Sequence, residues 1–208
     1  FIRNFVLNQF TPIQFNRDIQ NIDNEIQKSV RESKSGIYIE EAFAKATVSL
    51  FGPTTNTSDK EKSIQLLKLL IKSLPNNAIW QSSIAFELIA SLDDDSILRF
   101  ASGISKNFSQ AQNLHPAKLF YAGVIQEKLG NKQQAIQLFK KLAEGDAYNE
   151  QGYEFDALMK LAKYFASSNP SLSKHYLANL IKYKDYINAK DNQYKEAKAM
   201  LSKWPKGR

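Results

Sequence analysis

The chain contains no cysteine, and its 208 residues include only two histidines, eight glycines and six prolines. The absence of cysteine excludes disulfide bonds, thiolate metal sites and thiol catalysis. Low glycine and proline content, together with 43% hydrophobic residues, excludes collagen-like and broadly disordered chains. No run of about 18 apolar residues, the minimum for a membrane-spanning helix, occurs in the sequence. The composition is that of a chain able to bury a continuous core.

The sequence also lacks the residue spacings of common catalytic and cofactor sites. His115 and His175 lie far apart and form no HExxH pattern, so we expect no metal site and assign both to structural or solvent-exposed positions, with His115 at a helix start. Glycine-rich phosphate-binding patterns and the GxSxG nucleophile pattern are absent. The run 93–95 of three aspartates lacks the spaced ligands of an EF-hand loop, and helix capping is its expected role. We therefore expect a protein that is not an enzyme and needs no cofactor.

Amphipathic helical patterns fill most of the chain. A small residue recurs inside four of the predicted helices, at Ala44, Ala85, Gly123 and Ala157. Each is followed by a turn signal and a second amphipathic segment, and the intervals of 41, 38 and 34 residues fall among the periods of stacked helix-turn-helix repeats. The sequence therefore predicts an all-α chain of about four antiparallel helical hairpins, preceded by an N-terminal helix and followed by a C-terminal capping helix.

Apolar spacing and turn residues set the expected bounds of these elements. The predicted helices cover residues 12–34, 37–51, 59–74, 78–92, 95–108, 116–129, 132–143, 149–166, 171–184 and about 189–203. The predicted organisation is one helical-repeat domain spanning 1–208, with an N-terminal arm and helix at 1–36, hairpins at 37–184, and a basic capping helix and tail at 185–208.

Residues 116–149 resemble a tetratricopeptide (TPR) repeat. With Pro116 as the first position, the small residues, the turn glycine and the aromatic of that repeat fall on Gly123, Ala135, Gly130 and Phe139. Small residues let paired helices approach closely, and the aromatic fills the space between successive hairpins. The segment departs from the pattern at Leu119, Gln126, Leu142 and Ala147. The other three hairpins match more loosely, so other α-solenoid families stay open.

The resemblance implies a right-handed superhelix, an α-solenoid, in which the first helices of the hairpins line a concave groove. In that register the groove residues are Phe86, Ile89, Phe120, Val124, Glu127, Glu154, Leu158 and Leu161. We interpret the chain as a scaffold or adaptor that binds a protein or peptide there. The missing cysteines and the missing initial methionine leave the compartment undetermined, with the bacterial periplasm or envelope slightly favoured over the cytoplasm.

The net charge of +7 is concentrated at the C-terminal end and supports an alternative. Residues 181–208 hold eight basic and three acidic side chains, interleaved with three tyrosines and a tryptophan. Basic side chains that can bind phosphates, next to aromatic rings that can stack on bases, suit single-stranded nucleic acid. A capping helix with a solvated lysine-rich face explains the same pattern. Binding to an anionic membrane or an acidic protein also stays open. The candidate basic patch is Lys182, Lys184, Lys190, Lys195, Lys198, Lys203 and Lys206. The apolar segment 1–10 could also pair subunits into a homo-oligomer.

Overall fold

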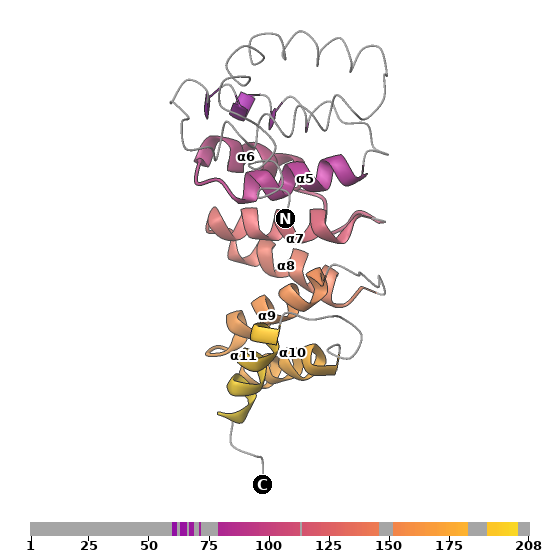
Figure 1. Cartoon of the computed structure of the whole chain (residues 1–208), viewed down its shortest axis with the longest axis vertical. Helices are drawn as coiled ribbons and strands as arrows, with labels where there is room; N and C mark the ends of the chain where they lie inside the picture. The colour runs from indigo at the N-terminus through magenta and orange to yellow at the C-terminus, as the bar shows by residue number, and fades with distance from the viewer. Residues whose placement is uncertain are drawn as a thin grey trace. The chain divides into compact units, whose positions relative to one another are not determined.

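A computed structural model describes residues 60, 61, 63–65, 67, 68, 71, 79–112, 114–145, 152–182 and 191–203. Contacts along the chain divide the protein into two compact units, Phe1–Ile104 and Ser105–Arg208, and each is described by itself. All regular secondary structure in the described ranges is helical (Figure 1). The predicted helices within 1–59 lie outside the described residues, and the organisation as one domain stays a prediction.

The first unit contains α5 (Ile79–Ala90) and α6 (Asp95–Ile104), which pack against each other. The described residues between 60 and 71 are also helical. At the start of α6, Asp94 Oδ1 accepts hydrogen bonds from the backbone N–H groups of Ser96 and Ile97, at 2.9 and 3.1 Å. These bonds satisfy amides that a helix start leaves without intrahelical partners. The capping role predicted for the aspartate run is therefore confirmed.

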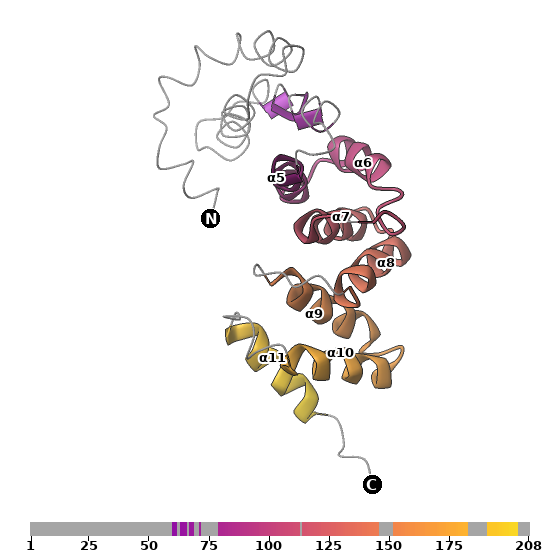
Figure 2. The same ribbon diagram turned by 90° about the vertical axis from the view of Figure 1, so that its right-hand side faces the viewer.

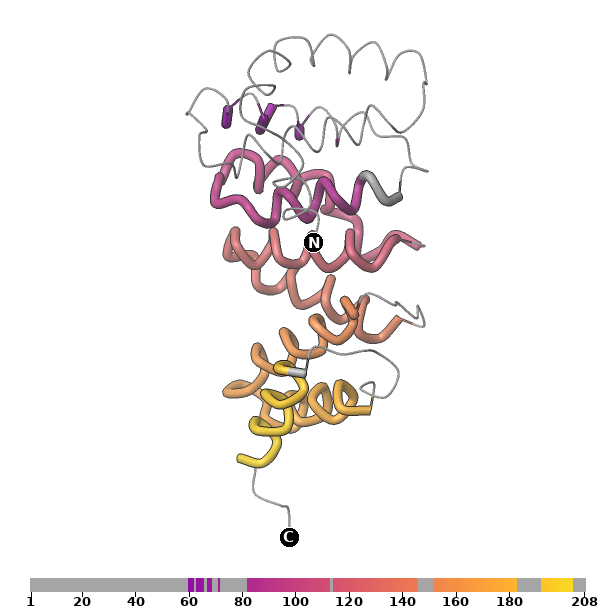
Figure 3. Tube along the Cα trace, in the orientation of Figure 1, coloured from indigo at the N-terminus to yellow at the C-terminus, as the bar shows by residue number. Residues whose placement is uncertain are grey.

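The second unit contains five helices in its described part. They are α7 (Pro116–Lys128), α8 (Lys132–Ala143), α9 (Tyr153–Phe165), α10 (Pro170–Lys182) and α11 (Asp191–Ser202). Each helix packs against the next, and α7 also contacts α9. Figure 2 shows α7, α9 and α11 following one another along one side of this unit, with α8 and α10 on the other. Figure 3 traces the chain from helix to helix in the view of Figure 1. The prediction of an all-helical chain with sequentially packed helices is confirmed.

Two residues define the start of α7. Pro116 occupies its first turn, where the missing N–H costs no helix hydrogen bond. His115 precedes it as the N-cap, and its Nδ1 accepts a hydrogen bond from the N–H of Ala117 at 3.3 Å. Burial lowers the pKa of His115, because a partly desolvated imidazole disfavours the charged form. The expected position of His115 at a helix start is confirmed.

The turn between α7 and α8 is held by a buried amide. Gly130 adopts a positive φ of 76°, a conformation that glycine reaches without strain. Asn131 Nδ2 donates a hydrogen bond to Gln126 Oε1 at 2.8 Å, and Gln126 is fully buried. Gln126 thus stands where the TPR pattern often has an aromatic residue, and its amide ties the end of α7 to the turn.

Helices α7 and α8 come close together at Gly123. A Cβ added there would lie 2.5 Å from Cε1 of Phe139, which is itself fully buried. The pairing therefore requires the small residue that the repeat pattern predicted at this position. Phe139 belongs to a continuous core formed by α8–α11, whose members are Ala135, Phe139, Leu142, Phe155, Ala157, Leu158, Met159, Leu161, Ala162, Tyr176, Leu177, Leu180 and Ala197.

A lysine on α8 anchors the segment that precedes α7. Lys141 Nζ donates hydrogen bonds to the backbone carbonyls of Ser109, at 3.1 Å, and of Ala111. Nearby in the sequence, Lys118 Nζ lies 5.1 Å from the ring centroid of Phe108, a cation–π contact between α7 and the same segment. Both cations thus fix the segment that leads into α7.

Candidate functional site

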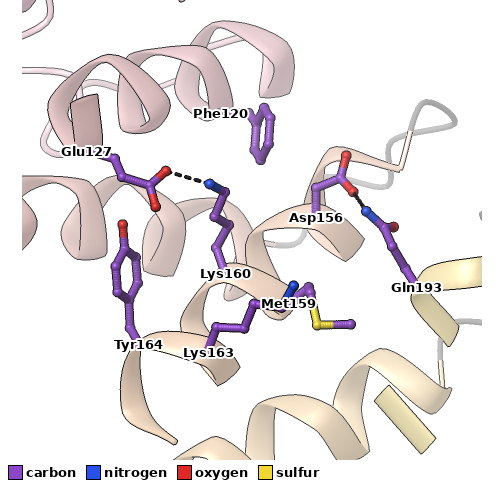
Figure 4. A pocket seen from close by; sticks show the side chains of 8 residues that line it. All are labelled: Phe120, Glu127, Asp156, Met159, Lys160, Lys163, Tyr164 and Gln193. Atoms are coloured by element: carbon purple, nitrogen blue, oxygen red, sulfur yellow. Dashed lines mark hydrogen bonds and ion pairs between the residues drawn. The ribbon is translucent and has the colours of Figure 1, made fainter. Parts of the chain in front are cut away.

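A pocket of about 350 Å³ is formed by α7, α9 and α11. Its lining residues are Phe120, Glu127, Asp156, Met159, Lys160, Lys163, Tyr164 and Gln193 (Figure 4). The first two belong to α7, the next five to α9, and the last to α11. These helices alternate with α8 and α10 along the chain, so the lining comes from every second helix of this unit's described part.

An ion pair joins α7 and α9 across the pocket. Glu127 Oε2 and Lys160 Nζ lie 2.5 Å apart, and their side chains are 32% and 35% exposed. Tyr164 directs its hydroxyl toward the same carboxylate (Figure 4). Burial raises the pKa of Tyr164, and the nearby Glu127 raises it further. The phenol therefore stays protonated at neutral pH, and its buried hydroxyl makes no hydrogen bond with a described residue.

A second polar contact closes the pocket toward α11. Gln193 Nε2 donates a hydrogen bond to Asp156 Oδ1 at 2.5 Å. This bond fixes the orientation of the amide, because the carboxylate accepts only from the nitrogen side. Gln193 Oε1 is buried and accepts no hydrogen bond from any residue in the described ranges. Beside it, Lys163 pairs with Glu196 of α11 at 2.8 Å, with side chains 51% and 45% exposed.

The remaining wall of the pocket is aromatic. The ring of Phe120 lies 5.4 Å from that of Tyr121, 5.7 Å from Phe139 and 5.6 Å from Tyr153, measured between centroids. Aromatic rings at such distances attract one another through their edges and faces beyond simple burial. Phe120 is therefore anchored on the core through Phe139 while it lines the pocket.

The structure separates the predicted groove residues into three groups. Phe120 and Glu127 line the pocket. Val124 is partly buried and packs against the core of α8–α11, and Glu154 is partly buried on α9 but does not line the pocket. The other four, Phe86, Ile89, Leu158 and Leu161, are only 1%, 0%, 1% and 0% exposed. These four are core side chains, and their expected place on an open groove face is corrected here.

The error on α9 comes from its helical register. The TPR register based on Ala157 placed the groove at Glu154, Leu158 and Leu161. The lining positions Asp156, Lys160 and Lys163 lie two residues later. At 3.6 residues per turn, two residues turn a side chain by about 200°, which is the opposite face of the helix. On α5 the apolar residues cover most faces, so periodicity could not separate core from groove.

Sequence reasoning missed the polar part of the lining. Asp156, Lys160, Lys163 and Tyr164 recur at helical spacing along α9, and this polar stripe was the available signal. A charged stripe on a helix is usually a solvated face, which is why it indicated no site. Gln193 had no signal of its own, because its contact with Asp156 spans 37 residues.

The candidate basic patch is only partly described. Lys182, Lys195, Lys198 and Lys203 are exposed, whereas Lys184, Lys190 and Lys206 lie outside the described residues. Lys198 Nζ lies 4.7 Å from the ring centroid of Tyr194, so the protein's own lysine covers one face of that ring. The other aromatic residues of the patch, Tyr183, Tyr186 and Trp204, also fall outside the described ranges.

Within the described ranges, no group of three or more histidine, aspartate or glutamate side chains could hold a metal ion. In the same part of the chain, no helix is both long and apolar enough to span a membrane. His175 is exposed, and its Nε2 lies 3.1 Å from Nδ2 of Asn179 one turn later.

Comparison of the chain with protein-family models, with curated proteins and with solved structures gave no match in any of the three. The described part of the chain is all-helical, with sequentially packed helices.

Proposed function

We propose that this chain is a non-enzymatic scaffold or adaptor of the TPR-like α-solenoid type. In this proposal its hairpins form a right-handed superhelix, and the first helices line a groove that binds a protein or peptide. The observation that carries the proposal is the origin of the pocket, whose lining comes from α7, α9 and α11 and includes no residue of α8 or α10. An array of hairpins offers such a surface along its length.

The chemistry of the pocket supports binding of a peptide. It combines the aromatic wall of Phe120 with charged and amide groups, as recognition of a polar chain with apolar side chains requires. Its ionisable groups are engaged with one another, Glu127 with Lys160 and Lys163 with Glu196.

Selection from a random peptide library tests the proposal. The full chain and its Phe120→Ala variant would each select peptides from a phage-displayed library, and affinities would be measured by fluorescence anisotropy. We expect Phe120→Ala to weaken the selected peptides at least about tenfold, because a buried aromatic anchor commonly dominates an interface. The control Lys174→Ala changes an exposed residue of α10 outside the pocket. Circular dichroism must show that Phe120→Ala stays helical, and equal affinity of both proteins for the selected peptides would refute the groove.

A second candidate, nucleic-acid binding, is supported by the exposed Lys195, Lys198 and Lys203 on or next to α11. Deletion of α11 would not separate the two functions, because this helix also supplies Gln193 to the pocket and Ala197 to the core. Replacing the three lysines by glutamine keeps the helix. Steeply salt-dependent binding of a single-stranded oligonucleotide that this triple variant loses would favour nucleic acid over the groove.

A further inference from the structure

We propose that the pocket receives a basic side chain, a lysine or arginine, of an extended peptide, which replaces the ammonium of Lys160 next to Glu127. The inference rests on the proposed peptide-binding function and adds the chemical class of the partner. It follows from the balance of hydrogen-bond acceptors and donors in the lining, from the role of Lys160, and from the rings beside it.

The lining contains a buried hydrogen-bond acceptor, Gln193 Oε1, that the described residues leave without a donor. Glu127 and Asp156 contribute carboxylates from α7 and α9, and Gln193 contributes an amide from α11. Since Gln193 Nε2 is committed to Asp156, its Oε1 is left as a buried acceptor that no described residue supplies with a donor. A ligand that brings N–H groups into this pocket therefore gains bonds that the protein does not make for itself.

The ammonium of Lys160 is suited to being displaced from Glu127 by a cation of the ligand. Of the two lining lysines, Lys163 is held by Glu196 at the exposed margin, whereas Lys160 pairs with Glu127 within the lining. Its ammonium sits on a flexible stem and offers a point charge with three donors. An arriving ammonium or guanidinium can offer Glu127 the same charge-assisted bonds, and a guanidinium adds further donors in a fixed plane.

The aromatic residues favour the same ligand. Phe120 lines the pocket beside Lys160 (Figure 4), and a desolvated cation is attracted to the face of such a ring. Tyr164 already receives one cation of the protein, because Lys132 Nζ lies 5.3 Å from its ring centroid. The Tyr164 hydroxyl points toward the carboxylate of Glu127 (Figure 4), so a cation bound beside this carboxylate would also lie near the phenol.

An acidic side chain would fit this pocket poorly. To bind it, Lys160 would have to leave Glu127, and the new carboxylate would then face the carboxylates of Glu127 and Asp156. Lys163 is already paired with Glu196. Like charges at short range repel one another, so the arrangement opposes an acidic ligand even though the chain as a whole carries a net charge of +7.

Substitution of Lys160 gives opposite results for the two kinds of ligand. The probes are synthetic peptide mixtures in which one position is fixed as lysine, arginine, glutamate or leucine and the other positions vary, and affinity for the full chain is measured by anisotropy. We expect the lysine- and arginine-fixed mixtures to bind at least about tenfold more tightly than the glutamate-fixed mixture. Lys160→Met should raise the affinity for basic mixtures several-fold because it removes the internal competitor, and Glu127→Gln should lower it about tenfold.

Charge-matched variants outside the pocket control for the overall charge. Lys174→Met and Glu144→Gln change the net charge of the chain as Lys160→Met and Glu127→Gln do, but both residues lie outside the lining. We expect these controls to alter the affinity for basic mixtures by less than about twofold. If Glu127→Gln loses its helical circular dichroism, Asp156→Asn provides the second acceptor variant, with the same expected loss.

The failures of the two proposals are distinguishable. Preferred binding of the glutamate-fixed mixture, weakened by Lys160→Met, would overturn the basic-ligand inference and leave the groove intact. The same would follow if Lys160→Met changed nothing while Phe120→Ala still reduced the affinity. If no mixture distinguished the wild type from Phe120→Ala, both the peptide-binding function and this inference would be wrong.

Discussion

At Gly123 the absence of a side chain determines how close two helices can pack. The ring of Phe139 occupies the space that a Cβ would enter, at 2.5 Å from Cε1 and 2.9 Å from Cζ. The ring cannot easily move away, because Phe139 is fully buried and contacts Phe120 and Tyr164. The same ring anchors the aromatic wall of the pocket, so the packing of this glycine also positions the site.

We predict that Gly123→Ala destabilises the protein by about 1–3 kcal/mol, because overpacking a well-filled core costs that much. The free energy of unfolding would be measured by urea denaturation followed by circular dichroism. Gly103→Ala is the matched control, since a Cβ there meets nothing within 4 Å. This control should stabilise α6 by up to about 1 kcal/mol through helix propensity. Equal effects at the two glycines would contradict the packing argument.

His115 makes stability depend on pH. Burial lowers its pKa in the folded state below the ordinary value of 6.5, so the unfolded chain binds the proton more readily. The free energy of unfolding therefore falls as the pH drops below about 6.5, and the loss continues until the pH is below the folded-state pKa. We predict that His115→Asn, which keeps a capping acceptor but does not titrate, reduces this loss. Urea unfolding of both proteins between about pH 7.5 and pH 5 checks it, and identical pH dependence would argue against the role of His115.

The positions of the helices could be predicted from the sequence, because local signals determine them. Every predicted bound within the described ranges lies within four residues of an observed one. The start of α7 at Pro116 and the turn at Gly130 depend on backbone constraints that the residue type alone imposes. The small residue at Gly123 could also be predicted, because only a small residue suits a close helix crossing.

The faces of the helices were harder to predict than their positions. On α9 a shift of two residues exchanged Leu158 and Leu161, which are core, for Lys160 and Lys163, which line the pocket. Aligning α9 to the repeat pattern through one small residue cannot determine which face of the helix points to the core, because several faces of α9 carry apolar residues. Gln193 was beyond local reasoning, since its contact with Asp156 depends on how α9 and α11 pack.

The attachment of α8 to the segment before α7 depends on Lys141. We predict that Lys141→Met destabilises the protein by about 1–3 kcal/mol, because the substitution keeps the apolar stem but removes the hydrogen bonds to the carbonyls of Ser109 and Ala111. Urea denaturation measures the change. Lys140→Met, one residue earlier on α8, is the control, and its Nζ lies 5.7 Å from the ring centroid of Phe165 instead. A larger loss at Lys140 than at Lys141 would show that the carbonyl contacts matter little.

The division into two units has a consequence for the whole molecule. The segment Ser105–Arg208 contains α7–α11, a continuous core and every residue of the pocket. We predict that this segment, produced alone, is helical, unfolds in one cooperative thermal transition, and binds the same peptides as the full chain within about threefold. Circular dichroism and anisotropy test this. A segment without a cooperative transition would show that the first unit is needed for folding.

The pocket is assembled from parts of the chain that are made at different times. Glu127 contacts Lys160, 33 residues later, and Asp156 contacts Gln193, 37 residues later. During synthesis α7 and α9 therefore leave the ribosome well before α11, and domains tend to fold as they emerge. The hairpins can bury much of their core while the last wall of the pocket is still missing. Under the proposed function, a chain that has emerged only as far as α10 would lack the Gln193 wall of the pocket and could not yet bind a peptide there.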